Sequence, residues 1–422
     1  MAGLTRKELL AGAAAAGVVA GCGGSSKKPA ALHGWAAVKA QFPLSPDVRH
    51  FDGFVLASHP RAVRAAIDRH RRGLDADPAG YLREHEVALD ERVAEAAARY
   101  LEVNASDLAL TVSTTMGLGL VYAGLQPRVK ERREAVATQH DFYATHEALR
   151  LRFGRVRKIR LYDDPAQATV KGIVDAVQAG IDDNTGVLAL TWVHSSTGVK
   201  LPLEDIAQVI DGERRSGMFV VVDGVHALAA DDGFVGIDSF DVFVAGCHKW
   251  LGGPRGTGLV WSIKAWDWLR PTIPSFAPAP YVAWLENRAI DDTAPPGPTF
   301  TPGGFHSFEH RWALAEAFDF HAKLGRAQVA ERIRSLATRL KEGLAELPKV
   351  RLVTPMSPSL SAGIVCFDID GVDPGEAVER LRREHRIAAS ITPYAARHVR
   401  LGTGLWVDEA DVDAAVTAVS RL

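Results

Sequence analysis

The sequence predicts an α/β fold, with a mostly parallel central sheet in a large domain followed by a small C-terminal α+β domain. Short apolar segments alternate with helical or loop segments between residues 109 and 261, and parallel strands need such crossover connections. From residue 350 onward the expected order changes to two strands, a helix, two strands and a helix. The 422 residues, 47% of them hydrophobic, suffice for a sizeable core and two or three domains.

The composition is that of a soluble globular chain. Its 51 acidic and 49 basic residues leave a formal charge of -2. Without a basic block the chain lacks the charge pattern of a nucleic-acid-binding protein, so no nucleic-acid partner is predicted. Three cysteines are too few for a disulfide framework.

Residues 1–22 resemble a bacterial signal peptide. Arg6 and Lys7 precede an apolar run at residues 9–21, which fits a signal-peptide core of about 7–15 residues and is shorter than the roughly 20 that span a bilayer. Residues 19–22, Val-Ala-Gly-Cys, resemble the lipobox of bacterial lipoproteins. Cys22 is therefore the predicted lipidation site.

Residues 5–10 also resemble a twin-arginine leader with Lys7 in place of the second arginine. A leader of this kind suits a protein that folds around a cofactor before export. The predicted location is therefore outside the cytoplasm, on the cell membrane through a lipid anchor. The alternative is a cytoplasmic protein whose Ala-rich leader contains Cys22 by chance.

The remaining elements follow in chain order. Residues 23–41 form a linker, residues 42–59 an irregular arm, and residues 60–73 and 87–100 carry apolar side chains at helical spacing. The predicted strands of the large domain are residues 109–112, 134–138, 187–191, 219–222, 242–245 and 258–261. A Pro- and Gly-rich segment and a strongly helical one follow at residues 276–304 and 309–347. The predicted C-terminal strands are residues 350–353, 361–367, 387–390 and 398–401, and the helices are residues 373–384 and 408–419.

These elements predict two domains after the leader and linker. The large domain covers residues 42–310, and its arm at residues 42–59 contributes to the small domain and the active site. The small C-terminal domain covers residues 311–422.

Asp223 directly follows the apolar strand at residues 219–222. The carboxyl ends of strands form the edge at which open α/β sheets bind ligands. A carboxylate in this place can also cap the following helix, and the residue alone leaves both roles open.

Lys249 lies 26 residues after Asp223, between a strand and a Gly-rich turn. Its neighbours Cys247, Trp250 and Leu251 predict burial, and a buried lysine must be paired or neutral. Imine chemistry requires an amine of this kind.

Because of the pair Asp223 and Lys249, the sequence from about residue 42 to the end resembles the class V aminotransferase family. These are pyridoxal 5'-phosphate (PLP) enzymes of fold type I, and they include isopenicillin N epimerases and cysteine desulfurases. The resemblance implies PLP as cofactor and Lys249, of the pair His248–Lys249, as the residue that forms the aldimine, with His248 as a further cofactor-binding residue. It implies that Asp223 keeps the pyridine nitrogen protonated, so that the ring can take up carbanion charge, and that His226 contacts the phenolic oxygen.

Other segments match the family in the same order along the chain. Residues 113–117, Ser-Thr-Thr-Met-Gly, resemble the phosphate-binding turn before a helix. This implies Thr114 and Thr115 as phosphate ligands, with Met116 contributing only its backbone. A simple helix cap is the alternative.

Three further matches concern the cofactor ring and the substrate. His140 aligns with the histidine that stacks on the ring, although an interior histidine is the alternative. Ser195 occupies the place of the asparagine of the desulfurases and is a predicted cofactor-binding residue. Arg400 matches the arginine that binds the substrate carboxylate with its planar fork, and Arg397 is the neighbouring alternative.

The resemblance also implies a homodimer. Residues 302–311 lie where related dimers extend a loop toward the partner's phosphate, so Thr301 and Arg311 are further candidates. Packing between the domains is the simpler explanation for both residues.

The expected reaction takes place at the α-carbon of an amino acid, with Lys249 as general base. Desulfurases need a cysteine on the loop at residues 387–397, which has none here, and Cys247 and Cys366 are predicted to pack in the core. Residues 140–143 and 248–250 resemble isopenicillin N epimerase-like members most. An aminotransferase and a C–S or β-lyase remain alternatives, and Tyr143 and Tyr394 are candidates for a second acid.

Two alternatives come from other classes of protein. A metal-dependent hydrolase is suggested by 15 histidines, but no His-Glu-x-x-His or paired-Cys spacing occurs, so no metal site is predicted. A lipid-anchored binding protein would explain the lipobox but not a buried lysine after a strand-end acid.

Overall fold

The computed structural model describes residues 34–126, 129, 134–213, 217–233, 240–289 and 296–422. The leader with Cys22 and residues 23–33 of the linker lie outside the described residues, whereas residues 34–41 of the linker are described and contain helix α2 (Trp35–Lys39). Among the helices of the described residues, none combines the length and the apolar character needed to cross a membrane.

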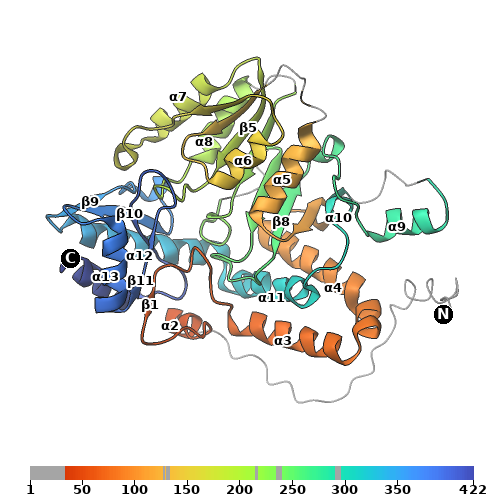
Figure 1. The fold of residues 1–422 in the computed structure, drawn as a ribbon, viewed down its shortest axis with the longest axis horizontal. Helices are drawn as coiled ribbons and strands as arrows, with labels where there is room; N and C mark the ends of the chain where they lie inside the picture. The colour runs from red at the N-terminus through yellow and green to blue at the C-terminus, as the bar shows by residue number, and fades with distance from the viewer. Residues whose placement is uncertain (1–33, 127–128, 130–133, 214–216, 234–239, 290–295) are drawn as a thin grey trace.

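A seven-stranded sheet forms the centre of the large domain (Figure 1). In spatial order its strands are β2 (Leu108–Thr111), β8 (Gly258–Ser262), β7 (Val242–Gly246), β6 (Phe219–Asp223), β5 (Thr185–Thr191), β3 (Glu134–Thr138) and β4 (Val156–Ile159). Neighbours from β7 to β4 are parallel, and β8 runs antiparallel to both β7 and β2. The predicted α/β class with a mostly parallel sheet is confirmed.

Helices cover both faces of this sheet, because alternate residues of each strand point to opposite sides. In β6, Val220 and Val222 join one apolar core, whereas Phe219 and Val221 join the other. The helices of the large domain and its flanking segments are α2 (Trp35–Lys39), α3 (Arg61–Ala76), α4 (Pro78–Leu101), α5 (Thr114–Leu125), α6 (Tyr143–Arg150), α7 (Val170–Gly180), α8 (Leu203–Glu213), α9 (Pro278–Leu285), α10 (Pro296–Phe300) and α11 (Phe308–Leu324).

The C-terminal part forms a second, antiparallel sheet with its own helices (Figure 1). This sheet has the order β12 (Ser390–Ile391), β13 (Val399–Gly402), β10 (Ile364–Ile369) and β9 (Val350–Leu352), and the helices are α12 (Arg326–Ala345), α13 (Pro374–His385) and α14 (Glu409–Val419). Helix α12 packs on α14, β9 and β10, whereas α11 packs on α3 and α4. The change between the two packings falls at Gly325. The division of the chain at residue 310 stays a prediction.

The arm at residues 42–59 joins the two parts of the molecule. Its strand β1 (Arg49–His50) pairs in parallel with β11 (Ile387–Ala388). The carbonyl of Phe51 accepts a bond from the Gly402 N–H at 2.7 Å, and the Ala57 N–H donates to the carbonyl of His248 at 3.0 Å. The arm therefore connects the small sheet with the loop that carries the lysine.

The structure differs from the predicted elements in several places. Helix α2 lies within the predicted linker, and strand β1 lies in the arm predicted to be irregular. Strand β4 was not predicted. The helical stretch at residues 309–347 is two helices, broken at Gly325, whose φ of 85° ends α11. The strand expected at residues 387–390 is two short strands in different sheets, and β10 begins three residues later than residue 361.

Candidate active site

The N-terminus of α5 forms the first part of the site. Ser113 caps the helix, with its Oγ accepting the Met116 N–H at 3.1 Å. Thr114 is buried, and its Oγ1 has no hydrogen-bond partner within the described residues. A Cβ atom on Gly246 would lie 2.9 Å from that oxygen and 3.0 Å from the ring of His248. Glycine thus leaves a small cradle between Thr114 and His248, where free helix N–H groups attract an anion such as a phosphate.

Lys249 lies in the turn after β7, with Nζ 3.0 Å from Nε2 of His226. Burial lowers the pKa of Lys249, and the guanidinium of Arg400 acts in the same direction, whereas the carboxylate of Asp223 opposes them. Burial also lowers the pKa of His226 far below its ordinary value. The site therefore contains a neutral imidazole beside an amine that loses its proton more readily than an exposed lysine.

Asp223 is the last residue of β6 and is 4% exposed. Its Oδ1 accepts the Val225 N–H at 3.0 Å. Burial raises the pKa of Asp223, while the Val225 N–H and the Lys249 charge favour the carboxylate. A carboxylate held in this way suits a cationic ring nitrogen.

His140 follows β3 and presents a flat, neutral ring. The ring stacks on Tyr162 with centroids 3.9 Å apart and an interplanar angle of 17°, and its Nε2 accepts the Leu161 N–H at 3.3 Å. Burial lowers the pKa of His140 to about 4, with a smaller effect of Arg160.

Behind His140 lies a buried polar network. Tyr162 Oη lies 2.9 Å from Nδ1 of His194 and 2.8 Å from Oγ1 of Thr197. Nε2 of His194 is 3.9 Å from Oδ1 of Asp141. This network fixes the aromatic ring on which His140 rests.

Arg400 reaches the site from β13. Its Nη1 donates to the carbonyl of Ser195 at 2.9 Å and its Nε to Oγ of Ser390 at 3.2 Å. The guanidinium carbon lies 5.0 Å from the ring centroid of Phe54, which packs beside His226 at 6.2 Å. Arg400 is 5% exposed, so its charge is available to a ligand in the site rather than to bulk water.

Ser195 and Tyr394 also lie at this end of the site, with Oγ and Oη 2.8 Å apart. Burial raises the pKa of Tyr394, so its hydroxyl keeps its proton. Tyr143, the other tyrosine considered, is 69% exposed on the first turn of α6.

Other predicted residues have different surroundings. Thr115 is exposed on α5. Arg397 pairs with Asp373 at 3.5 Å, so Arg400 is the arginine that lies at the site. Thr301 Oγ1 accepts the Leu110 N–H at 3.0 Å.

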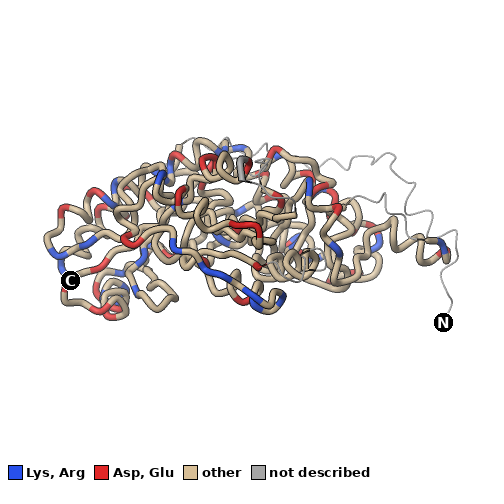
Figure 2. The backbone as a smooth tube through the Cα atoms, turned by 90° about the horizontal axis from the view of Figure 1, so that it is seen from above, with Lys and Arg blue, Asp and Glu red and all other residues tan. Residues whose placement is uncertain are grey.

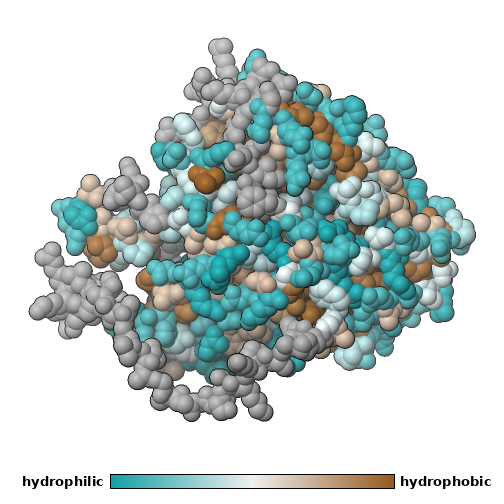
Figure 3. Space-filling model, turned by 180° about the vertical axis from the view of Figure 1, so that it is seen from behind, coloured by the Kyte–Doolittle hydropathy of each residue, from teal (hydrophilic) through white to brown (hydrophobic). Residues whose placement is uncertain are grey.

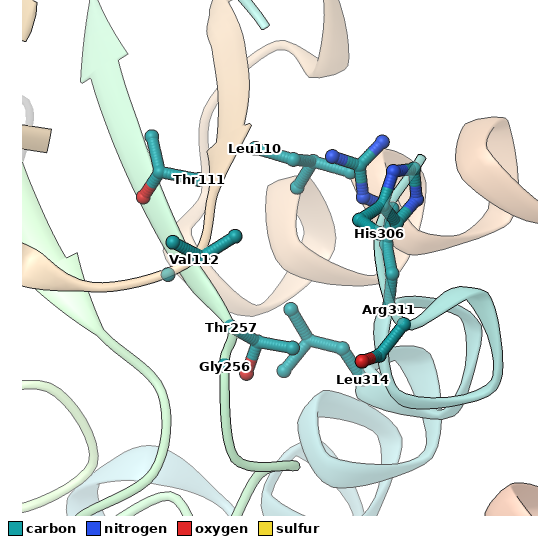
Figure 4. A pocket seen from close by; sticks show the side chains of 10 residues that line it. Leu110, Thr111, Val112, Gly256, Thr257, His306, Arg311 and Leu314 are labelled. Atoms are coloured by element: carbon teal, nitrogen blue, oxygen red, sulfur yellow. The ribbon is translucent and has the colours of Figure 1, made fainter. Parts of the chain in front are cut away.

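Arg311 forms an ion pair with Asp90, N···O 3.2 Å, at the start of α11. Together with His306 it lines a small pocket beside the ends of β2 and β8 (Figure 4). The pocket also includes Thr111 and Thr257.

Neither described cysteine is suited to act as a nucleophile. Cys247 and Cys366 are both fully buried, and burial raises the pKa of each thiol to about 12. The described residues also contain no cluster of three or more His, Cys, Asp or Glu side chains that could hold a metal ion.

These residues fit the cofactor that the sequence implies. The hydroxyl of Thr114, which has no partner within the described residues, and the space above Gly246 suit a phosphate. The carboxylate of Asp223 suits a protonated pyridine nitrogen, and the amine of Lys249 interacts electrostatically with both Asp223 and Arg400. Sequence analysis missed Phe54, Tyr162 and His194 as parts of the site. His194 lies next to the predicted Ser195, but no sequence pattern marks Phe54 or Tyr162.

Comparison with known proteins gives a consistent result. The family model described as aminotransferase class-V matches residues 81–413. Isopenicillin N epimerase of Streptomyces clavuligerus is 27% identical over 415 residues, covering 93% of this chain and 99% of that protein. A cysteine desulfurase of Yersinia pestis is 25% identical over 267 residues, covering 61% of this chain and 63% of that protein.

Solved structures agree in fold. A variant of the protein C-DES, with glycine covalently linked to its PLP cofactor, superposes with a TM-score of 0.81 at 20% identity, covering 91% of this chain and 99% of that chain. C-DES is described as a cystine C–S lyase in its complex with cysteine persulfide, which superposes with a TM-score of 0.81 at 21% identity and covers 90% of this chain and 100% of that one.

Proposed function

Because the chain belongs to the class-V aminotransferase family and is a PLP-dependent enzyme, we propose that it moves a proton at the α-carbon of an amino acid, as an epimerase similar to isopenicillin N epimerase. Membership of this family favours a PLP-dependent enzyme over the two alternatives from other classes, a lipid-anchored binding protein and a metal-dependent hydrolase. The family includes several reactions, and epimerisation is the proposed one.

One observation carries the proposal: the site combines the half-buried amine of Lys249, whose pKa is lowered, with the buried guanidinium of Arg400, while both described cysteines hold their protons in the core. Persulfide chemistry needs an accessible thiolate. Besides the electron sink that the cofactor would supply, proton transfer at carbon needs an amine of lowered pKa and a fixed carboxylate binder, and it needs no thiolate. The match over 99% of the length of the S. clavuligerus epimerase supports the same choice.

Each residue then has a defined task. Arg400 binds the substrate carboxylate through charge-assisted hydrogen bonds. Nζ of Lys249 takes the proton from the α-carbon, and an acid must return a proton to the opposite face of that carbon to complete the inversion. The Tyr394 hydroxyl, which keeps its proton, is the candidate for this acid. PLP, when bound, supplies an electron sink for the charge that remains at this carbon.

The other residues would hold the cofactor. Thr114, His248 and the N-terminus of α5 bind the phosphate, and Asp223 keeps the ring nitrogen protonated. His140 would stack on the cofactor ring and exclude water from it. Ser195 and Tyr394 close the site at the substrate end, where the Tyr394 hydroxyl still carries its proton.

The test has two stages. Purified protein is incubated with PLP and reduced with borohydride, and the labelled peptide should contain Lys249, with no label in Lys249→Ala. A panel of L- and D-amino acids, including isopenicillin N, is then followed in D2O. Solvent deuterium at the α-carbon together with the opposite enantiomer or epimer supports the proposal.

The competing reactions give other products. A keto acid formed without inversion of configuration indicates an aminotransferase, and release of sulfide or pyruvate from cystine indicates a lyase. Either result as the dominant reaction refutes the epimerase proposal and leaves the family assignment intact.

We further propose that the protein is exported and anchored through Cys22. The support is the leader sequence alone, because residues 1–33 lie outside the described structure. Cys22→Ala should abolish membrane partitioning and change the cleavage pattern. Unchanged membrane partitioning and unchanged cleavage would refute the lipid anchor at Cys22.

A homodimer is proposed as well. Apolar side chains are exposed around α9, which stands away from the body of the protein (Figure 1) and carries apolar residues on its surface (Figure 3). Among them are Phe276, Tyr281 and Trp284, which stack in sequence at 5.7 and 6.2 Å. Charges of both signs are distributed over the molecule (Figure 2). Analytical ultracentrifugation tests the dimer, and a monomer at micromolar concentration would contradict it.

A further inference from the structure

Trp250 follows Lys249 in the chain and contacts the same histidine. It is 1% exposed. Its ring stacks on Phe54, with centroids 6.0 Å apart and 22° between planes, and on Trp406 at 6.5 Å and 23°. Packing on these rings fixes the direction of its indole N–H, which donates to Nδ1 of His226 at 3.4 Å.

This contact determines where His226 carries its proton. An indole nitrogen can only donate a hydrogen bond, so Nδ1 of His226 must offer a lone pair. Burial lowers the pKa of His226, and the charges of Lys249, Arg400 and, less strongly, His248 do the same. The ring is therefore neutral, and a neutral imidazole with a bare Nδ1 has its hydrogen on Nε2.

The Nε2–H of His226 faces Nζ of Lys249 at 3.0 Å. An N–H group is attracted by a lone pair, which an amine has and an ammonium lacks. We propose that Trp250 is a positioning residue that, by fixing the tautomer of His226, keeps Lys249 in the form of a neutral amine.

Two charged groups also face Lys249. Asp223 favours the ammonium form and Arg400 disfavours it. The Nε2–H of His226 adds to the effect of Arg400 and opposes Asp223. The proposal concerns the protein without cofactor, so it does not depend on which reaction the enzyme catalyses.

The test measures Lys249 directly in the cofactor-free protein. Acetylation by acetic anhydride is followed against pH, and peptide mass spectrometry quantifies the label on Lys249. Trp250→Phe keeps an aromatic ring and removes the N–H, so His226 can turn its lone pair toward an ammonium. The pH at which acetylation of Lys249 is half-maximal should rise by at least about 0.5 unit. At a fixed pH below this midpoint, the fraction of Lys249 present as the neutral amine is then about threefold smaller. An unchanged midpoint overturns the proposal.

A double-mutant cycle separates the tautomer from packing. Leucine can neither donate nor accept a hydrogen bond, so in a His226→Leu background the Trp250→Phe substitution should leave the midpoint unchanged to within about 0.2 pH unit, well below the shift expected beside His226. An equal shift in both backgrounds means that Trp250 acts through packing, and it overturns the proposal.

A second measurement does not require the Trp250 variant to fold. In protein labelled with 15N-histidine, the His226 signals are identified by their loss in His226→Gln. We expect a protonated Nε2 and an unprotonated Nδ1 in the unsubstituted protein. A proton on Nδ1 overturns the proposal.

Discussion

His321 is a buried histidine that should make the protein sensitive to acid. It lies on α11, is 0% exposed, and neither ring nitrogen makes a hydrogen bond of ordinary length within the described residues. Burial lowers its pKa from 6.5 to about 4, with the Leu251 backbone acting in the opposite direction. The substitution that tests this is His321→Leu, which keeps a similar volume and removes the titrating group.

The sign and size follow from proton linkage. Between pH 6.5 and about 4 the unfolded chain binds a proton at residue 321 and the folded chain does not. The free energy of unfolding therefore falls as the pH falls through this window. With these two pKa values, His321 alone removes about 2 kcal/mol between pH 7 and pH 5.

The assay is urea unfolding of the cofactor-free protein at pH 7 and pH 5, followed by tryptophan fluorescence. The loss of stability between the two pH values should be smaller in His321→Leu by about 2 kcal/mol. At pH 7 the variant should be as stable as the unsubstituted protein or slightly more stable, because a buried polar group without a partner is removed. The control His385→Leu, on α13, should retain the full acid sensitivity. The reasoning is refuted if His321→Leu loses as much stability between pH 7 and pH 5 as the unsubstituted protein.

Three other predictions concern the site. Arg400→Lys keeps the charge but loses the planar fork, so KM for the amino acid should rise about 10- to 100-fold with a smaller change in kcat; a change in kcat alone in steady-state kinetics would contradict this. Asp223→Asn should still bind PLP, but α-deuterium exchange, measured by mass spectrometry, should slow by about 100-fold or more because the pyridinium loses its counter-charge; an unchanged rate would remove Asp223 from its proposed role. Thr114→Ala should weaken PLP binding about 5- to 10-fold, the effect of one hydrogen bond, and Thr114→Ser should restore it in a fluorescence titration; equal binding by all three proteins would argue against the phosphate cradle.

The buried strands could be predicted because they are apolar on both faces. Strands β5, β6 and β7 lie in the middle of the sheet, and each is a continuous apolar run in the sequence. Strand β4 could not be predicted in this way. Its sequence is Val-Arg-Lys-Ile. It is an edge strand that pairs with β3 on one side only, and charged side chains on an edge strand discourage its free side from pairing with another chain. Arg157 pairs with Glu134 of the neighbouring strand, N···O 2.7 Å.

The centre of the site could be predicted for a related reason. Asp223 ends β6 and Lys249 follows β7, and these strands are adjacent in the sheet, so the order of strands brings the two residues together. Phe54 and Tyr162 could not be predicted. Phe54 reaches Arg400 only because the arm pairs with β11 and β13, which lie more than 300 residues later in the sequence. Contacts between residues so far apart in the sequence leave no local pattern. The helix break at Gly325 escaped prediction because the apolar spacing continues on both sides of it.

The arm that joins the two parts of the molecule has a consequence for biosynthesis. Residues 49–57 leave the ribosome early, but their partners at residues 387–388 and 402 are among the last to be made. At about 5–20 residues per second, the arm waits for tens of seconds before it can pair. The lysine loop, which the Ala57 N–H contacts at His248, therefore receives its final support only after translation is nearly complete. A truncated or stalled chain would contain every residue from Thr114 to Lys249 and still lack the arm's docking partners.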